Sequence, residues 1–244
     1  MADTGAYLAD LQVPSELEGT SMSSNPATIT GTALSGTTPN RLSRLLLMGP
    51  AGAGKRTQGV ALAQRLEIPA LSPGELFRNI IGNNTPLAAR LRDVIAYGGY
   101  VDDDTANIEV GRRLTAPAFS DGFVLYGYPR TLNQVRHLDD LLGQQQAQVD
   151  AVVRLDVPDE ELVDRLLTHE EQLGRIDDHA DTIRARLALY HERTEPLIDI
   201  YEARELVVTV DATGTFGQVR ERIDSALSQL PRGSAQATQS SSLG

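Results

Sequence analysis

Short apolar runs and segments with helical apolar spacing alternate through most of the 244-residue chain. The apolar runs are typical of buried strands and lie at 44–48, 68–71, 122–126, 150–156 and 206–210. Apolar residues spaced three and four apart predict helices near 55–66, 74–82, 86–97, 103–114, 131–144, 158–169, 178–203 and 215–229. Strands that alternate with helices pair in parallel, because each crossover helix returns the chain to the end of the sheet at which the previous strand began. We therefore expect an α/β fold with a five-stranded parallel sheet flanked by helices.

Both ends of the sequence lack this pattern. Residues 1–40 are rich in Ser, Thr, Gly, Ala and Pro, with one modest apolar patch at 7–13. Residues 231–244 are also mostly small and polar. Such segments cannot bury enough apolar surface to offset the entropy lost on ordering. We predict two disordered tails around one domain at 41–230, and the apolar patch either docks on a surface or has no role.

The strand predicted at 44–48 runs into a glycine-rich turn, Gly-Pro-Ala-Gly-Ala-Gly-Lys-Arg-Thr at 49–57. This is the form of a phosphate-binding P-loop, in which backbone N–H groups surround a phosphate and the following helix N-terminus adds partial positive charge. Lys55 can reach the outer phosphates, and it is the only lysine among 22 basic residues. The strict motif has Ser or Thr directly after lysine, whereas here Arg56 precedes Thr57. A turn without a ligand is the alternative, and the retained lysine favours the phosphate site.

Composition narrows the classes of function. The formal net charge of −11 argues against a general nucleic-acid surface, so an anionic substrate needs arginines gathered locally. The absence of cysteine excludes disulfides and thiolate metal sites, and no two of the four histidines have metal-site spacing. No apolar run approaches the roughly 20 residues needed to cross a bilayer, and no signal segment is recognisable. We expect a cytoplasmic protein without membrane or nucleic-acid partners.

A second motif, Gly-Phe-Val-Leu-Tyr-Gly-Tyr-Pro-Arg-Thr-Leu-Asn-Gln, occupies 122–134. Together with the turn at 49–57 it resembles the motifs of nucleoside monophosphate kinases, adenylate kinase above all, and the resemblance extends over about 41–230. The resemblance implies a P-loop NTPase-type sheet, a helical lobe for the acceptor nucleotide near 72–101 and a short lid near 168–178. The ATP-binding residues that it implies are Gly52, Ala53, Gly54, Lys55, Arg56, Thr57, Arg165 and Gly214.

The same resemblance implies an acceptor site for AMP. Residues 70–78 resemble the segment that opens the family's acceptor lobe, and Arg78 matches the arginine that holds the acceptor phosphate. Pro73 replaces a threonine that touches the base, which weakens recognition there because a hydroxyl and an N–H are lost. Gln134 matches an amide that reads the adenine edge, which favours AMP over UMP or CMP. The implied AMP-binding residues are Pro73, Arg78, Gly99, Tyr100, Val101, Gly127, Tyr128, Pro129, Arg130, Gln134, Arg175 and Arg186.

Tyr126 is the most serious departure from the family pattern. It stands where the family has an aspartate at the strand end, whose carboxylate anchors magnesium through its water shell. A phenol with a pKa of about 10 is a poor substitute at neutral pH. We therefore expect no protein carboxylate at the metal: Mg²⁺ would arrive with ATP and be held by the phosphates, water and Thr57. Glu75 replaces another family aspartate, and His169 a lid arginine.

The resemblance implies an adenylate kinase-like phosphotransferase that makes two ADP from ATP and AMP. Phosphoryl transfer depends chiefly on positioning and charge neutralisation. The catalytic cations implied here are Lys55, Arg130, Arg175 and Arg186. The substitutions at Tyr126, Pro73 and His169 leave two alternatives open, namely an impaired nucleotide-binding paralogue acting as a sensor or partner protein, and a kinase for another nucleoside monophosphate. A monomer is expected, and the sequence indicates no partner for the N-terminal tail.

Overall fold

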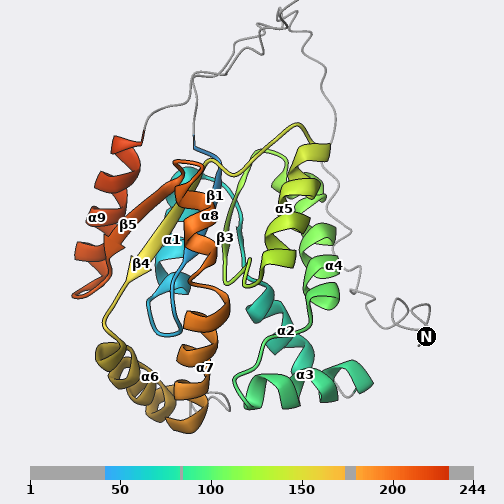
Figure 1. Ribbon diagram of the computed structural model, residues 1–244, viewed down its shortest axis with the longest axis vertical. Coiled ribbons are helices and arrows are strands. Elements are labelled where there is room, and N and C mark those ends of the chain that lie inside the picture. The colour runs from blue at the N-terminus through green and yellow to red at the C-terminus, as the bar shows by residue number, and fades with distance from the viewer. Residues whose placement is uncertain (1–41, 83–84, 174–179, 231–244) are drawn as a thin grey trace, which may run out of the picture. The chain divides into compact units, whose positions relative to one another are not determined.

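The computed structural model describes residues 42–82, 85–173 and 180–230 (Figure 1). Both predicted tails lie outside these residues, as does Arg175. The strands are β1 (Arg44–Met48), β2 (Ala70–Leu71), β3 (Phe123–Tyr126), β4 (Ala151–Asp156) and β5 (Val207–Asp211). They pair in the order β2-β3-β1-β4-β5, and each pairing is parallel. The predicted five-stranded parallel sheet is therefore confirmed, with β1 in its middle.

The helices of the described residues lie close to their predicted positions. They are α1 (Lys55–Leu66), α2 (Pro73–Ile81), α3 (Pro86–Ala96), α4 (Asp103–Leu114), α5 (Leu132–Gln144), α6 (Asp159–Leu173), α7 (Ala180–Arg193), α8 (Leu197–Glu202) and α9 (Phe216–Gln229), with a 3₁₀ turn at Pro117–Phe119. Four of them begin with a side chain that accepts a backbone N–H of the first turn, and these caps are Thr85, Asp102, Thr131 and Thr215. Such caps satisfy donors that the helix itself leaves unpaired.

Two apolar cores cover the two faces of the sheet. Leu45 and Leu47 of β1 belong to the core that includes side chains of α1, α6, α7 and α9. Leu46 and Met48 belong to the other core, which includes side chains of α4, α5 and α8 (Figure 1). Successive side chains of a strand point to opposite faces, so burial of both faces explains the apolar run at 45–48 in β1. The turn after β1 consequently opens at the carboxyl edge of a fully covered sheet.

Two helix predictions were wrong in extent. The single helix predicted at 178–203 is divided into α7 and α8, because Pro196 has no N–H and disfavours helical backbone in the residue before it. The helix predicted at 158–169 continues to the end of α6, so it includes the first part of the predicted lid at 168–178. Residues 174–179 lie outside the described part of the chain. None of the described helices is long and apolar enough to span a membrane.

Candidate active site

A cavity of about 1010 Å³ opens where β1 delivers the glycine-rich turn to α1. Its walls come from the turn, from α2, from the segment after β3 and from α6, α7 and α9. The predicted residues that line it are Gly52, Ala53, Gly54, Lys55, Arg56, Thr57, Arg78, Tyr100, Gly127, Tyr128, Pro129, Arg130, Arg165, Arg186 and Gly214. Predicted donor-side and acceptor-side residues therefore share one space. Arg175 lies outside the described residues, so its role in this cavity stays a prediction.

A second cavity of about 70 Å³ lies on the acceptor side. The predicted residues that line it are Pro73, Arg78, Gly99, Tyr100, Val101, Gly127, Tyr128, Arg130, Gln134 and Arg186. Arg78, Arg130 and Arg186 line both cavities. These three guanidinium groups therefore stand at the junction between the two spaces.

The turn after β1 has the backbone that a phosphate cradle needs. Gly52 and Gly54 have φ values of 83° and 86°, a region that side chains other than glycine rarely adopt. A Cβ on Gly52 would also lie 3.1 Å from Leu166 Cγ, so α6 packs directly on the turn. Helix α1 begins at the next residue, Lys55, and its first turn contains no acidic residue. An anion is the ligand that such a helix start favours.

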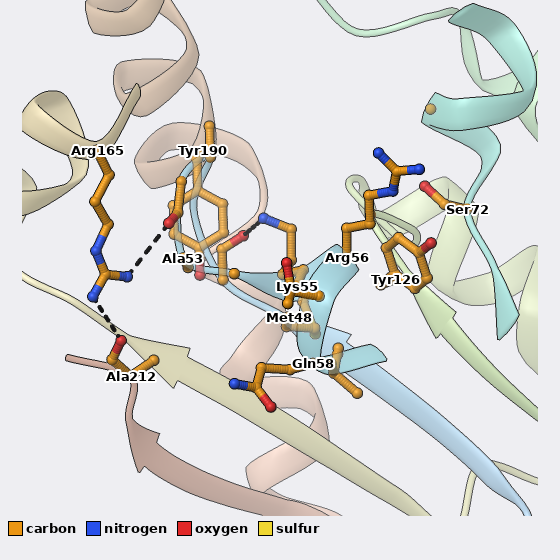
Figure 2. A pocket seen from close by; sticks show the side chains of 18 of the residues that line it. Met48, Ala53, Lys55, Arg56, Gln58, Ser72, Tyr126, Arg165, Tyr190 and Ala212 are labelled. Atoms are coloured by element: carbon orange, nitrogen blue, oxygen red, sulfur yellow. Dashed lines mark hydrogen bonds between the residues drawn. The ribbon is translucent and has the colours of Figure 1, made fainter. Parts of the chain in front are cut away.

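The Lys55 ammonium is held by the turn and surrounded by like charge. Its Nζ donates to the carbonyl of Gly49 at 2.7 Å and to that of Pro50 (Figure 2). Burial, followed by the positive charges of Arg130, Arg186 and Arg78, lowers the pKa of Lys55 to about 7. Four cations that mutually repel in one cavity are stabilised by a multiply charged anion.

Arg165 joins three parts of the cavity wall. Its guanidinium donates to the carbonyl of Ala212 after β5 at 2.9 Å and to the Glu161 carboxylate one turn earlier in α6. A longer contact of 3.5 Å reaches the carbonyl of Gly52 (Figure 2). The planar fork of arginine suits this bridging, because it donates in several fixed directions. Arg165 thereby ties α6 to the phosphate-binding turn.

Tyr126, the unexpected residue at the end of β3, is part of a polar cluster. Its hydroxyl donates to Glu75 Oε2 at 3.1 Å, and Arg56 Nε lies 2.7 Å from Glu75 Oε1. Burial, followed by the Glu75 charge and its hydrogen bond, raises the pKa of Tyr126 to about 12, so the phenol stays a neutral donor. The departure at the strand end is thus linked to the departures at Arg56 and Glu75. Figure 2 shows Arg56 and Tyr126 next to each other at the wall of the cavity.

The Tyr126 ring requires glycine at position 59 in α1. A Cβ on Gly59 would lie 2.9 Å from Tyr126 Cδ1, closer than carbon atoms approach. Gly to Ala inside a helix normally stabilises by roughly 0.5–1 kcal/mol, but overpacking a core costs roughly 1–3 kcal/mol. We predict that Gly59→Ala lowers the free energy of unfolding, measured by urea denaturation. In a Tyr126→Leu background the same substitution is expected to stabilise; a Gly59→Ala protein more stable than wild type would contradict the contact.

Gln134 is held inside the protein. Its Oε1 accepts the N–H of Arg130 at 2.8 Å, and its Nε2 donates to Asp103 Oδ1 at 2.7 Å. Gln134 is only 2% exposed. One lone pair of the oxygen and one N–H remain for a ligand. The predicted base-reading role of Gln134 stays a prediction, and the structure adds a second role, which is to fix the backbone of Arg130.

Several residues of the site had no functional prediction from the sequence. Glu75 was noted only as a replacement, and its link to Tyr126 depends on how α2 lies against β3. Tyr190 and Thr194 line the cavity from the end of α7, where the sequence shows an ordinary helix. Of these residues, only Phe216 could have been noticed in the sequence, because it is a large apolar residue at a helix start, two residues after Gly214. In the structure it lines the cavity and is 46% exposed. Within the described ranges, no three His, Asp or Glu side chains are grouped to hold a metal.

Comparison with known proteins gives a consistent result. A family model described as "Adenylate kinase" matches residues 47–206. Similar curated proteins include an "Adenylate kinase" of Nocardioides sp., 44% identical over 188 residues that cover 77% of this chain and 98% of the relative. An "Adenylate kinase" of Micrococcus luteus is 43% identical over 182 residues, covering 75% and 89%, and one of Nocardia farcinica is 43% identical over 184 residues, covering 75% and 98%. The resemblance drawn from the two motifs is confirmed.

Proposed function

The chain belongs to the adenylate kinase family, and from this premise we propose that it transfers the γ-phosphoryl group of ATP to AMP, forming two ADP. The observation that carries the proposal is the shared cavity, in which the P-loop lysine and the acceptor-side arginines meet. Its volume of about 1010 Å³ lies at the upper end of the roughly 300–1,000 Å³ of ordinary ligand pockets. Room for two nucleotides is what direct transfer between them requires.

We propose a single in-line displacement. The AMP phosphate oxygen attacks the γ-phosphorus as the bond to the β-bridging oxygen breaks, and the electron pair leaves with ADP. Lys55 and the N–H groups of the turn would neutralise the donor phosphates, and Arg78 would hold the acceptor phosphate. Arg130 and Arg186, which line both cavities, would stabilise the charge on the transferring group. No covalent enzyme intermediate or general base is needed.

The residues at the cavity wall fit a magnesium ion that enters with ATP. Magnesium in phosphoryl-transfer sites binds through phosphates, water and one or two carboxylates, and supplies charge neutralisation there. Among described side-chain atoms, Glu75 Oε1 is buried and receives no hydrogen bond of good geometry, although Arg56 Nε lies 2.7 Å away. Thr57 and Glu75 both line the cavity. The sequence predicted no protein carboxylate at the metal; we propose instead that the Thr57 hydroxyl and the Glu75 carboxylate would hold the ion's water shell in place of the carboxylate that Tyr126 cannot supply.

Glu75→Gln tests this arrangement by metal binding. The amide keeps the shape but loses the charge, so we expect Mn²⁺ to bind the protein–ATP complex about tenfold more weakly, as for outer-shell partners elsewhere. Electron paramagnetic resonance of free Mn²⁺ measures the affinity. Glu67→Gln is the matched control, because that exposed residue follows the far end of α1. Equal Mn²⁺ affinity in the Glu75→Gln protein and the wild type would contradict the role of Glu75.

Binding of ATP is expected to load a proton onto Lys55. In the free protein the pKa of Lys55 is lowered to about 7, so the Lys55 amine is mostly neutral at pH 8. Phosphates favour the charged form and raise the pKa again, so about one proton should be taken up per ATP at pH 8. Calorimetry in buffers of different ionisation enthalpy counts the protons. Lys55→Arg is expected to show none, because a guanidinium is already charged; the absence of uptake in the wild type would contradict the low pKa.

Substrate choice tests the proposed function itself. Initial rates of diphosphate formation from Mg-ATP are to be compared with AMP, UMP, CMP and GMP as acceptors. We expect AMP to give the highest kcat/KM. A higher kcat/KM for another monophosphate would overturn the assignment of AMP as the acceptor, although the protein would still be a kinase. We also propose that the enzyme is monomeric and cytoplasmic; the donor-side and acceptor-side residues of the proposed site come from the same chain.

A further inference from the structure

The side chain of Tyr100 contacts Arg130 in two ways. The guanidinium carbon of Arg130 lies 4.6 Å from the centre of the Tyr100 ring. The Tyr100 hydroxyl lies 2.8 Å from Thr194 Oγ1, and Thr194 Oγ1 donates to the carbonyl of Arg130 at 3.1 Å. A threonine hydroxyl has one proton, so Thr194 must accept from Tyr100. The result is a directed chain from Tyr100 through Thr194 to the Arg130 backbone.

Other contacts fix the rest of Arg130. Its Nε donates to the carbonyl of Gly127 at 2.8 Å, and its N–H donates to Gln134 Oε1. A Cβ on Gly127 would come 3.4 Å from Arg130 Nη2, and a Cβ on Gly74 3.6 Å. The guanidinium therefore runs over two glycines and against the Tyr100 ring.

Arg130 lies near a second cation, Lys55, that repels it. Arg130 lowers the pKa of Lys55, which means that the two positive charges interact unfavourably in the free protein. The face of an aromatic ring carries partial negative charge and attracts a cation without adding a formal charge that would compete with phosphate. A carboxylate in the same place would neutralise the site for its ligand. Tyr100 can thus retain the arginine before nucleotide binds.

The turn that carries Tyr100 is itself docked on α7. Thr182 of α7 donates to the carbonyl of Ala96 at 3.1 Å. Gly98 has a φ of 74°, and a Cβ there would lie 2.8 Å from Arg186 Cγ, so the chain passes directly over that arginine. The turn between α3 and α4 thereby contacts two of the arginines at the junction of the cavities. Its placement on α7 keeps the Tyr100 ring beside Arg130.

We propose that Tyr100 is a positioning residue that holds the Arg130 guanidinium in place for phosphoryl transfer, with Thr194 connecting its hydroxyl to the Arg130 backbone. The inference rests on the proposed function, and it assigns to the Tyr100 side chain a role beyond the predicted backbone contact with AMP. The ring makes the direct contact with the guanidinium, so the ring, more than the hydroxyl, should determine the effect on turnover.

Kinetics of three variants separate positioning from folding. We expect Tyr100→Leu to lower kcat about tenfold, the scale of one lost cation–π contact in a partly desolvated site, with the KM for ATP within about twofold of wild type. Tyr100→Phe keeps the ring and should retain kcat within about threefold. Tyr97→Leu is the matched control, because Tyr97 is 82% exposed in the same turn and should change neither constant. A Tyr100→Leu protein with unchanged kcat would overturn the proposal.

A double-mutant cycle tests whether Tyr100 acts through Arg130. In an Arg130→Ala background we expect Tyr100→Leu to change the residual kcat by less than about twofold, because the group that it positions is gone. A further tenfold loss would show that Tyr100 acts independently of Arg130 and would overturn the proposal.

A measurement without turnover distinguishes failure of this inference from failure of the kinase assignment. In ¹⁵N-labelled protein, the Arg130 Nε–H resonance should carry a ring-current shift that Tyr100→Phe keeps and Tyr100→Leu removes. If that pattern holds and the wild type forms no ADP, the proposed function fails and the contact stands. If ADP forms and the resonance is the same in all three proteins, the positioning role is contradicted and the kinase stands.

Discussion

Lys55→Met is expected to lower kcat for ADP formation by about 10³-fold, the upper range for removing one preorganised group that stabilises developing charge. The turn itself holds the ammonium, through the carbonyls of Gly49 and Pro50. Methionine has a similar length and flexibility but cannot donate or carry charge. The Lys55→Met protein should be more stable than the wild type, most of all below about pH 7 and progressively less up to about pH 10.5, because folding of the wild type lowers the Lys55 pKa from 10.5 to about 7. Loss of activity would then accompany equal or higher stability.

A coupled assay of ADP formation and urea denaturation at pH 6.5 together check this prediction. Arg65→Met is the matched control, because Arg65 is a cation in the last turn of the same helix and pairs with Asp224 at 2.9 Å away from the cavity. The control should lose less than about twofold in kcat and little stability, as for exposed ion pairs. A Lys55→Met protein with kcat within about tenfold of the control would contradict the proposed role of Lys55 in phosphoryl transfer.

Arg130→Lys is expected to lower kcat by about 10²-fold although the charge is kept. The guanidinium of Arg130 has a planar fork, of which Nε donates to the carbonyl of Gly127 at 2.8 Å, and Arg130 lines both cavities. An ammonium is a point charge that cannot keep the Gly127 contact and reach the phosphates together. The KM values for ATP and AMP should change less than kcat, because the lost interaction belongs mainly to the transition state.

Arg204→Lys provides a matched control for that substitution. Arg204 also lies over a tyrosine, 5.2 Å from the centre of the Tyr201 ring, and it pairs with Asp139 through two nitrogens at 2.9 and 2.7 Å. It does not line either cavity. The control should keep kcat within about twofold. Equal losses in both variants would mean that arginine at position 130 serves stability and not transfer.

The sheet and the phosphate-binding turn were predictable because local signals decide them. The apolar run at 45–48 is typical of a strand buried on both faces, and the glycines that follow it are typical of a close approach of the backbone. The division of the helix predicted at 178–203 could also have been predicted, because Pro196 lies inside that range. The apolar periodicity on both sides of the proline outweighed that signal in the prediction.

The parts that the sequence did not indicate depend on contacts between distant segments. Tyr126, Glu75 and Arg56 appeared as three separate departures from a motif, and only the packing of α2 beside β3 and α1 joins them. Tyr100 and Thr194 are 94 residues apart, and nothing local predicts their hydrogen bond. Side-chain partners chosen across a cavity are set by tertiary packing, which short-range patterns do not encode.

We propose above all that this set of cations around a shared cavity makes a working phosphotransferase despite tyrosine at the end of β3. The most direct test is the turnover number of the wild-type chain for ADP formation from ATP, AMP and Mg²⁺. We predict an ordinary kinase value of about 1–100 per second. An inactive wild type, with activity appearing in Tyr126→Asp, would contradict the account and favour a nucleotide-binding protein that has lost catalysis.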